Sequence, residues 1–184
     1  MLKRIKQWMQ GGAAEAGASV PGATAGLNIL MVCSGNICRS PTAEGVLRAK
    51  LQRAGVRGVQ VNSAGTHGYH LSEAPDARAQ AAAQRRGYDL SRLRARPVQE
   101  ADFSRFQWLL AMDASHLAWL QQRAQQAPPQ QLRLLMTHSL RFKGITDVPD
   151  PYYGSPAGFE HVLDLVEDAC DGLVELIRHQ QAAL

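Results

Sequence analysis

One short stretch of this sequence combines residue types that can carry out phosphoryl transfer. Cys33 and Arg39 are separated by five residues, and Ser40 follows the arginine directly. A thiolate is a strong nucleophile, and a guanidinium can bind two phosphate oxygens at once, which an ammonium group does less well. The Ser40 hydroxyl can donate to the thiolate and help it leave a phosphocysteine. The spacing therefore predicts a phosphate-binding catalytic loop with Cys33 as its nucleophile.

The residues between the cysteine and the arginine suit a tight anion-binding loop. Such a loop points successive backbone N–H groups inward, and the N-terminus of a following helix adds to the positive field. The same field favours the thiolate form of Cys33. Gly35 and Asn36 are residue types that tolerate a left-handed backbone, which a tight cradle requires. We assign phosphate binding and loop support to Ser34, Gly35, Asn36, Ile37, Cys38 and Ser40.

The elements on both sides of the loop fit this role. Residues 29–32 form a continuous apolar run, which is typical of a strand buried on both faces. After the loop, apolar residues repeat at helical spacing up to Ala54, with Pro41 in the first turn and Gly55 at the end. A strand before and a helix after the loop distinguish this site from a chance pairing of residues around an inert buried cysteine.

The same alternation of strand and helix continues along the chain. Further strands are predicted at 59–63, 108–112 and 132–136, and further helices at 77–86, 115–124 and from 159 to the C-terminus. This order predicts an α/β fold: a four-stranded parallel sheet of Rossmann-like type with helices on both faces. Ligands of such sheets bind beyond the carboxyl ends of the strands, which is where the Cys33 loop lies.

The first 26 residues differ in composition from the rest. Residues 1–10 are basic with a few apolar positions at helical spacing, and residues 11–26 are rich in alanine and glycine. We interpret residues 1–26 as a flexible N-terminal extension and 27–184 as one domain, because ten residues are too short for a stable lone helix. A short amphipathic helix lying on a membrane surface is the alternative.

Composition and charge narrow the class of protein. The chain has 184 residues, of which 45% are hydrophobic, and its net charge is +4, as in an ordinary globular domain. Arginine-rich stretches at 85–86 and 92–96 are either solvated helix faces or a field that attracts anionic substrates. No aromatic residues are interleaved with them as in a nucleic-acid-binding surface. No apolar run is long enough to form an integral membrane segment.

The cysteines indicate the compartment. The three cysteines, Cys33, Cys38 and Cys170, form neither a disulfide framework nor a zinc-site spacing, and no secretory signal precedes them. We therefore expect a cytoplasmic protein that needs no metal or other cofactor. Cys170 lies on the apolar face of the last predicted helix and is expected to be part of the core.

Three stretches resemble the low-molecular-weight protein tyrosine phosphatases: residues 32–41, 63–66 and 150–154. The likeness runs from Asn28 to the last helix. It implies metal-independent hydrolysis of phosphotyrosine through a phosphocysteine intermediate. It also implies that Cys33 is the nucleophile, Arg39 the phosphate ligand and Asp150 the general acid. Pro151 stiffens the backbone beside that carboxyl, and the aromatic residues next to it lower the local dielectric, which suits an acid.

The same resemblance implies a cleft for a flat ring. Tyr152 and Tyr153 would line one wall and Tyr69 the opposite wall, so that a phenyl ring would be sandwiched between them. Cys38 stands where the family can form a reversible disulfide with the nucleophile, which protects it from irreversible oxidation. Filling of the loop by a small side chain is the alternative role for Cys38.

The resemblance implies a phosphotyrosine-containing protein as partner. Bacterial relatives often act on tyrosine kinases that control polysaccharide export, and other relatives act on soluble signalling proteins; the sequence does not select between them. Two residues depart from the family pattern, Gln107 in place of an acidic residue and Arg86 in place of a frequent histidine. Neither position carries a catalytic role.

Three other functions are compatible with the same fold. An arsenate reductase of the thioredoxin-coupled type needs two further resolving cysteines, and none lies between Cys38 and Cys170. The related phosphoarginine phosphatases carry threonine at the position of Ile37, where an apolar side chain suits an aryl phosphate better. An inactive phosphotyrosine-binding module would be expected to lack the nucleophile or the acid, both of which are present.

Overall fold

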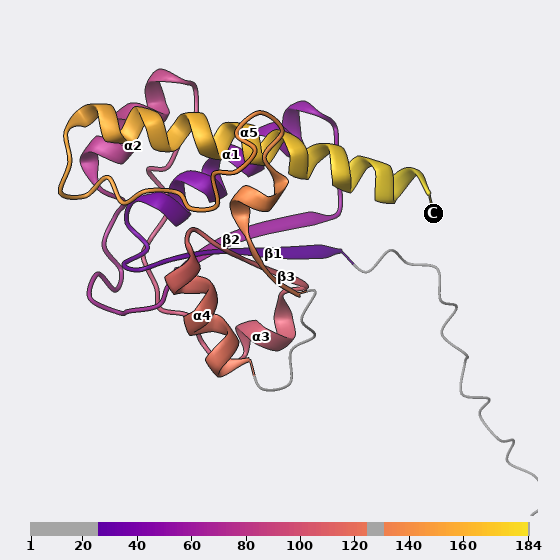
Figure 1. Ribbon diagram of the computed structural model, residues 1–184, viewed down its shortest axis with the longest axis horizontal. Coiled ribbons are helices and arrows are strands. Elements are labelled where there is room, and N and C mark those ends of the chain that lie inside the picture. Colours follow the sequence, from indigo (N-terminus) through magenta and orange to yellow (C-terminus); the bar gives the residue numbers. More distant parts are fainter. Residues whose placement is uncertain (1–25, 125–130, 184) are drawn as a thin grey trace, which may run out of the picture.

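Four parallel strands form the central layer of this computed structural model, which describes residues 26–124 and 131–183 (Figure 1). The strands are β1 (Leu27–Cys33), β2 (Val59–Gly65), β3 (Trp108–Ala111) and β4 (Leu132–Leu134), and their order across the sheet is β2-β1-β3-β4. β1 lies between β2 and β3, and the side chains of its apolar run are buried in the cores on the two faces of the sheet, as predicted. The predicted four-stranded parallel sheet is confirmed.

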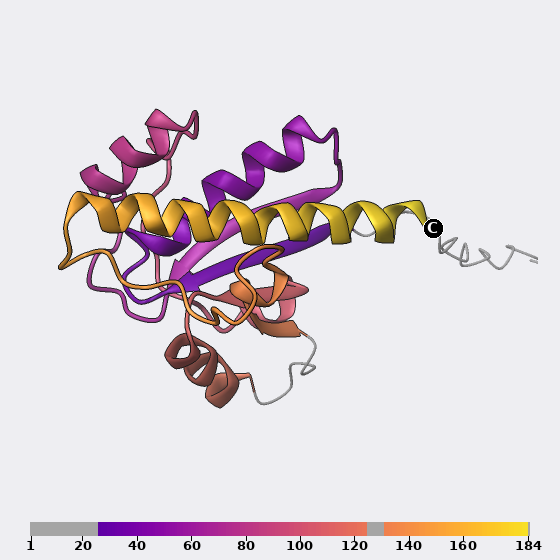
Figure 2. The same ribbon diagram turned by 45° about the horizontal axis from the view of Figure 1, so that its top comes forward.

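Helices cover both faces of this sheet, as predicted. α1 (Arg39–Arg53), α2 (Ala77–Arg85) and α5 (Pro156–Ala182) lie on one face, and α3 (Asp102–Arg105) and α4 (Ala114–Arg123) lie on the other (Figures 1 and 2). Alternate residues of β1 serve the two layers, since side chains of a strand point to opposite faces. Ile29 and Met31 belong to the larger core with α1 and α5, and Leu30 and Val32 to the smaller core with Leu120 of α4.

One local prediction was wrong, and one short helix was missed. β4 ends at Leu134, and the residues predicted to extend it form a 3-10 helix, η2 (Leu135–His138). Leu135 and Met136 are buried in the core on the side of α5. Their apolar character therefore reflects core packing and not strand pairing. The four-residue helix α3 was not predicted at all. Residues 1–25, which make up nearly all of the predicted N-terminal extension, lie outside the described residues.

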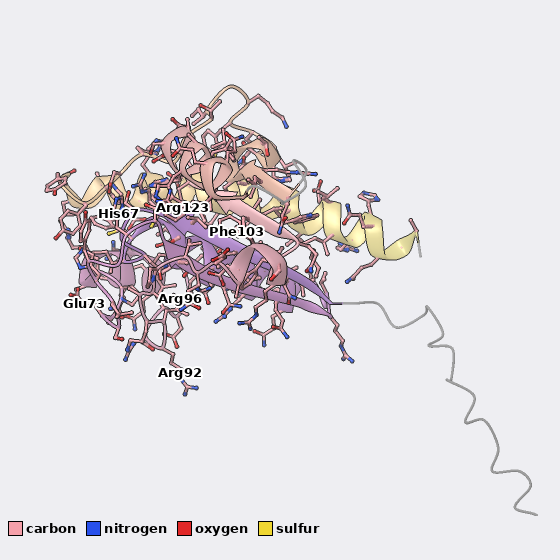
Figure 3. All side chains as sticks on the ribbon, turned by 90° about the horizontal axis from the view of Figure 1, so that it is seen from below. His67, Glu73, Arg92, Arg96, Phe103 and Arg123 are labelled. Carbon is pink, nitrogen blue, oxygen red and sulfur yellow. The ribbon has the colours of Figure 1, made fainter. Side chains whose placement is uncertain are left out.

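The arginine-rich stretches are largely engaged in ion pairs. Arg85 and Arg86 both pair with Glu160 of α5, and Arg96 pairs with Asp102 at 2.8 Å. Arg92 is exposed and projects away from the body of the molecule (Figure 3). These arginines therefore stabilise the fold more than they provide a free field for anions. Among the described helices, none has the length and apolar character needed to cross a membrane.

Candidate active site

The predicted catalytic loop connects the end of β1 to the start of α1. Cys33 is the last residue of β1, and α1 begins at Arg39. The carbonyl groups of Cys33 and Ser34 accept hydrogen bonds from the backbone N–H groups of Thr66 and His67, which follow β2 (2.8 and 3.0 Å). Because C=O and N–H point in opposite directions across a trans peptide, carbonyls held outward leave the next N–H groups facing the loop centre. The loop therefore stands at the N-terminus of α1 in a geometry that can accommodate an anion.

Asn36 stabilises the loop from behind. Its backbone is left-handed, with φ of 57°, as predicted from its residue type. Its side-chain NH₂ donates to the hydroxyls of Ser40 and Ser63, both at 2.8 Å, and its carbonyl oxygen accepts the backbone N–H of Arg96 at 3.0 Å. Ser63 in turn donates to Glu44 at 2.5 Å. A buried polar network with each of these partners in place holds one loop shape.

Gly35 has a different role from the one predicted. Its φ is not in the left-handed region, so the expectation of a left-handed backbone was wrong at this position. Instead, an added Cβ would lie 2.9 Å from the ring of His70, which packs over the loop. The glycine leaves room for this close approach, and a side chain here would oblige the His70 ring to shift.

The nucleophile candidate is buried beside a hydroxyl. Cys33 is 3% exposed, and its Sγ lies 3.0 Å from Ser40 Oγ, so the hydroxyl can donate to a thiolate there. Burial raises the pKa of the neighbouring Cys38 to about 12, with a contribution from the negative charge of Asp76. Cys38 is therefore a neutral thiol at physiological pH, one loop position before Arg39.

Arg39 gathers carboxylates from two distant segments. Its side chain is 5% exposed, and Nη1 pairs with Asp113 Oδ2 at 2.8 Å and donates to the Val148 carbonyl at 3.3 Å. Nη2 pairs with Asp150 Oδ2 at 2.9 Å and faces Ser34 Oγ at 3.4 Å. The guanidinium thus joins the loop, the end of β3 and the predicted general acid in one cluster.

Asp150 is carried to the loop by a segment tied to β3. The backbone N–H of Val148 donates to the Met112 carbonyl at 2.7 Å, and Val148 is fully buried. Beyond this anchor, Asp150 Oδ1 accepts the backbone N–H of Tyr152 at 3.1 Å, while its side chain stays 47% exposed. Its carboxyl is therefore fixed in place but open to a bound molecule.

A cavity of about 210 Å³ brings most of the predicted site together. Its lining comes from the loop, the arginine, the acid and the rim: Cys33, Ser34, Gly35, Ile37, Cys38, Arg39, Tyr69, His70, Asp150, Tyr152 and Tyr153. Of the predicted loop residues, Asn36 and Ser40 support the loop from behind. The rings of Tyr152 and Tyr153 meet edge to face at 5.0 Å, and both, with Tyr69, are partly or largely exposed. The cavity thus combines the Cys33 loop and Arg39 with aromatic side chains.

The rim on the Tyr69 side is built from two further pairs. The rings of His67 and Tyr69 stack with 5.0 Å between their centroids, and His70 Nδ1 lies 2.8 Å from Glu73 Oε2. His67 and Glu73 lie toward the same end of the molecule in Figure 3, the end at which the parallel strands finish. The stacking on His67 restricts the position of the exposed Tyr69 ring.

This arrangement agrees with one protein family. The family model of the low molecular weight phosphotyrosine protein phosphatases matches residues 28–183. The chain belongs to this family. It is accordingly a protein tyrosine phosphatase, within the phosphoric monoester hydrolases.

Individual members of the phosphatase family confirm the similarity. A low molecular weight protein-tyrosine-phosphatase of Streptomyces coelicolor is 43% identical over 155 residues, which are 83% of this chain and 94% of the relative. The crystal structure of YfkJ from Bacillus subtilis has a TM-score of 0.79 at 32% identity and covers 86% of this chain and 99% of YfkJ. The structure of DARP, a Drosophila arginine phosphatase, has a TM-score of 0.75 at 28% identity, with 80% and 96% covered.

Three polar residues of this phosphatase site were missed by the sequence analysis. Asp113 and His116 begin α4 and contact the loop, and His70 lies on the cavity wall. A signal was available for Asp113, because it follows β3 closely and the carboxyl ends of parallel strands meet at one edge. His116 and His70 carried no such signal. Within the described parts of the chain, no group of three or more His, Cys, Asp or Glu side chains is arranged to hold a metal ion.

The two departures from the family pattern have structural explanations. Gln107 Oε1 accepts the backbone N–H of Asn28 at 2.8 Å, where β1 starts, at the end of the sheet away from the cavity. Arg86 donates to carboxylates of α5, including Glu160 and Glu167, and so fixes α2 to α5. Neither residue lines the cavity of this phosphatase.

Proposed function

We propose that this phosphatase hydrolyses phosphotyrosine in proteins with Cys33 as nucleophile, Arg39 as phosphate ligand and Asp150 as general acid. One observation carries this assignment: the thiol, the guanidinium and the carboxyl line a single cavity at the N-terminus of α1. A phosphoryl group in that cavity would have the nest of N–H groups beneath it and the carboxyl at its outer side.

In the first step, the Cys33 thiolate attacks phosphorus and the bond from phosphorus to the phenolic oxygen breaks. Asp150 delivers a proton to that oxygen, so tyrosine leaves as a neutral phenol. Arg39 and the loop N–H groups bind the equatorial oxygens, where negative charge is concentrated throughout the transfer. The enzyme is left with a phosphocysteine and an ionised Asp150.

In the second step, a water molecule attacks the phosphocysteine. Asp150 now takes a proton from the water, the bond between sulfur and phosphorus breaks, and inorganic phosphate forms. The electron pair returns to the sulfur of Cys33. Ser40 Oγ, at 3.0 Å from that sulfur, donates to the thiolate and so makes it a better leaving group.

An aromatic phosphate ester fits this cavity better than a phosphoguanidine. Ile37 contributes an apolar side chain to the cavity wall, and Tyr69, Tyr152 and Tyr153 supply ring faces for a phenyl group. DARP is similar in structure and is an arginine phosphatase, so phosphoarginine is the second candidate substrate. Hydrolysis of a phosphotyrosine peptide and a phosphoarginine peptide of the same sequence distinguishes the two. We expect preference for phosphotyrosine.

Two other functions are less compatible with these residues. A thioredoxin-coupled reductase needs accessible resolving cysteines, whereas Cys170 is fully buried in α5 and burial raises the pKa of its thiol. An inactive binding module has no need of a thiol, an arginine and an acid on one cavity wall.

We place this activity in the cytoplasm and on a protein substrate. A thiol nucleophile must stay reduced, which favours a reducing compartment. A tyrosine kinase of polysaccharide export is one candidate substrate protein, in keeping with the family resemblance.

Turnover of an aryl phosphate in EDTA tests the mechanism. We expect the wild type to hydrolyse p-nitrophenyl phosphate in EDTA, and Cys33→Ser to be inactive while still folded. Cys170→Ala is the matched control, because it removes a buried cysteine that does not line the cavity and should retain activity. Dependence on added metal, or an active Cys33→Ser, would refute the phosphocysteine mechanism.

A further inference from the structure

One buried imidazole contacts both supports of the phosphate-binding arginine. Arg39 Nη1 pairs with Asp113 Oδ2 at 2.8 Å, and Nη2 faces Ser34 Oγ at 3.4 Å. His116, 3% exposed, places Nε2 at 2.8 Å from Ser34 Oγ and Nδ1 at 2.9 Å from Asp113 Oδ1. Arg39, Asp113, His116 and Ser34 therefore form a closed ring of polar contacts around the side of the loop.

The fold fixes His116 in this ring from the opposite side of the sheet. Asp113 is the N-cap of α4, and its Oδ1 accepts the backbone N–H of His116 at 3.0 Å and the Ser115 hydroxyl at 2.6 Å. The imidazole therefore stands in the first turn of α4 and approaches the loop from that helix, whereas Arg39 begins α1 on the other face (Figure 1). Nδ1 is buried and lies 2.9 Å from Oδ1 without forming a hydrogen bond of its own, so this is a close polar contact.

The charges define the direction of the contacts. Burial raises the pKa of Asp113, but hydrogen bonds from His116 and Ser115 outweigh it and hold that pKa well below its usual value, so the carboxylate is ionised. With a proton on Nδ1, the edge of the imidazole that faces the carboxylate is its donor edge, and Nε2 is the acceptor for the Ser34 hydroxyl. The oxygen of Ser34 is then left to accept from Arg39 Nη2. In the closed ring of four residues, each residue thus either donates a hydrogen bond to the next one or accepts one from it.

We propose that His116 is a positioning residue that fixes Arg39 for phosphate binding through Ser34 and Asp113. This inference rests on the proposed role of Arg39 as the phosphate ligand. A phosphoryl group in the loop competes with Asp150 for Nη2, and once Asp150 is displaced, Asp113 and Ser34 are the side chains still holding the guanidinium. His116 connects these two, so it keeps the plane of the guanidinium fixed while its partner changes.

Two substitutions of His116 test the contacts of its two ring nitrogens separately. His116→Asn retains an amide near the Nδ1 position and loses the contact with Ser34, whereas His116→Gln retains a polar group near the Nε2 position. We expect His116→Asn to raise the Ki of inorganic phosphate by about tenfold, and His116→Gln to restore it to within about threefold of the wild type. In a Ser34→Ala background, His116→Asn should change Ki by less than about twofold, because the contact is already absent.

The measurement is competitive inhibition of p-nitrophenyl phosphate hydrolysis by inorganic phosphate, with folding checked by thermal unfolding. His138→Leu is the matched control: it also removes a largely buried imidazole, but one that stacks on Trp108 at the start of β3, and it should leave Ki unchanged. The ratio of rates for good and poor leaving groups should also stay constant in the His116 variants, since that ratio reports on Asp150.

Two results separate this inference from the proposed function. If Arg39→Lys leaves the Ki of phosphate unchanged, Arg39 is not the phosphate ligand and the proposed function fails. If Arg39→Lys raises Ki but His116→Asn and His116→Gln behave alike, or the effect of His116→Asn is the same with and without Ser34, His116 is a structural residue only and this inference is overturned.

Discussion

Arg39 is shared by two carboxylates that differ in exposure. The side chain of Asp113 is 19% exposed and that of Asp150 is 47% exposed, and they lie 2.8 and 2.9 Å from the guanidinium. A phosphate dianion that binds Arg39 must replace one of them, because a guanidinium offers a limited number of N–H donors. Asp150 is the more exposed partner, so under the proposed assignment we expect it to be the one that is displaced. Its release from Arg39 would leave the carboxyl beside the leaving oxygen, where a general acid is needed.

Replacement of the acid should affect substrates according to their leaving groups. A phenol with a high pKa needs the proton more than nitrophenol does, so Asp150→Ala should slow phenyl phosphate by about 10²-fold or more and p-nitrophenyl phosphate much less. The measurement is kcat for a series of aryl phosphates. Asp147→Ala is the control, because Asp147 caps α4 by accepting the Ala114 N–H and lies outside the cavity. Equal slowing across the series would exclude Asp150 from the acid role.

At the level of elements, the loop depends on how closely β2 approaches it. The first backbone groups after β2 donate to the loop carbonyls, and Gly65 at the end of β2 pairs in register with Cys33 at the end of β1. A Cβ on Gly65 would lie 2.5 Å from the Ser34 carbonyl oxygen and 2.9 Å from that of His67. Both are backbone atoms, which cannot turn away as a flexible side chain can. The absence of a side chain at Gly65 therefore allows the contact that orients the loop.

Gly65→Ala should damage the loop more than the rest of the fold. The new methyl group must push Ser34 away, which tilts the N–H groups that face the phosphate, so we expect kcat/KM for p-nitrophenyl phosphate to fall by about tenfold or more. Gly68→Ala is the matched control, because its Cβ would meet only Pro97 at an ordinary 3.9 Å. Steady-state kinetics and thermal unfolding of both variants make the comparison. Unchanged kinetics in Gly65→Ala would show that the loop does not depend on this contact.

For the whole molecule, local patterns in the sequence were sufficient for the sheet and the loop. The apolar runs of β1 and β3 and the spacing from Cys33 to Arg39 are properties of consecutive residues, so they could be predicted. The contact of Arg39 with Asp113 is not such a property, because the two are 74 positions apart and meet only when β1 and β3 pair; the position of Asp113 just after β3 was the one available signal. His116, further into α4, carried no such signal. The strand predicted through 136 failed because burial against α5, not pairing, makes Leu135 and Met136 apolar.

The longest helix connects the core to the segment that carries the acid. Asp168 of α5 is 2% exposed and accepts hydrogen bonds from the Ser139 hydroxyl at 2.5 Å and from the Leu140 backbone N–H at 3.0 Å. It also accepts from the backbone and side chain of Arg141. These bonds fix the start of the stretch that follows η2 and leads to Asp150. One buried carboxylate therefore links the stability of the whole molecule to the position of its proposed acid.

The contribution of this carboxylate should depend on pH. Burial raises the pKa of Asp168, but hydrogen bonds from Ser139 and Arg141 outweigh it and lower the pKa from 3.8 to about 2. Because the folded state binds the proton more weakly than the unfolded state, the stabilisation is complete above the unfolded value and is lost as the pH falls from about 4 to about 2. Asp168→Asn should therefore lower the free energy of unfolding by about 2 kcal/mol at neutral pH, and the difference from the wild type should shrink toward pH 2. Urea unfolding between pH 2.5 and 7 measures this difference.

Asp171→Asn is the control. It removes a half-exposed carboxylate of α5 that pairs with Lys50 of α1, and it should lower the free energy of unfolding much less. A constant difference at all pH values would mean that Asp168 acts through packing rather than through its charge.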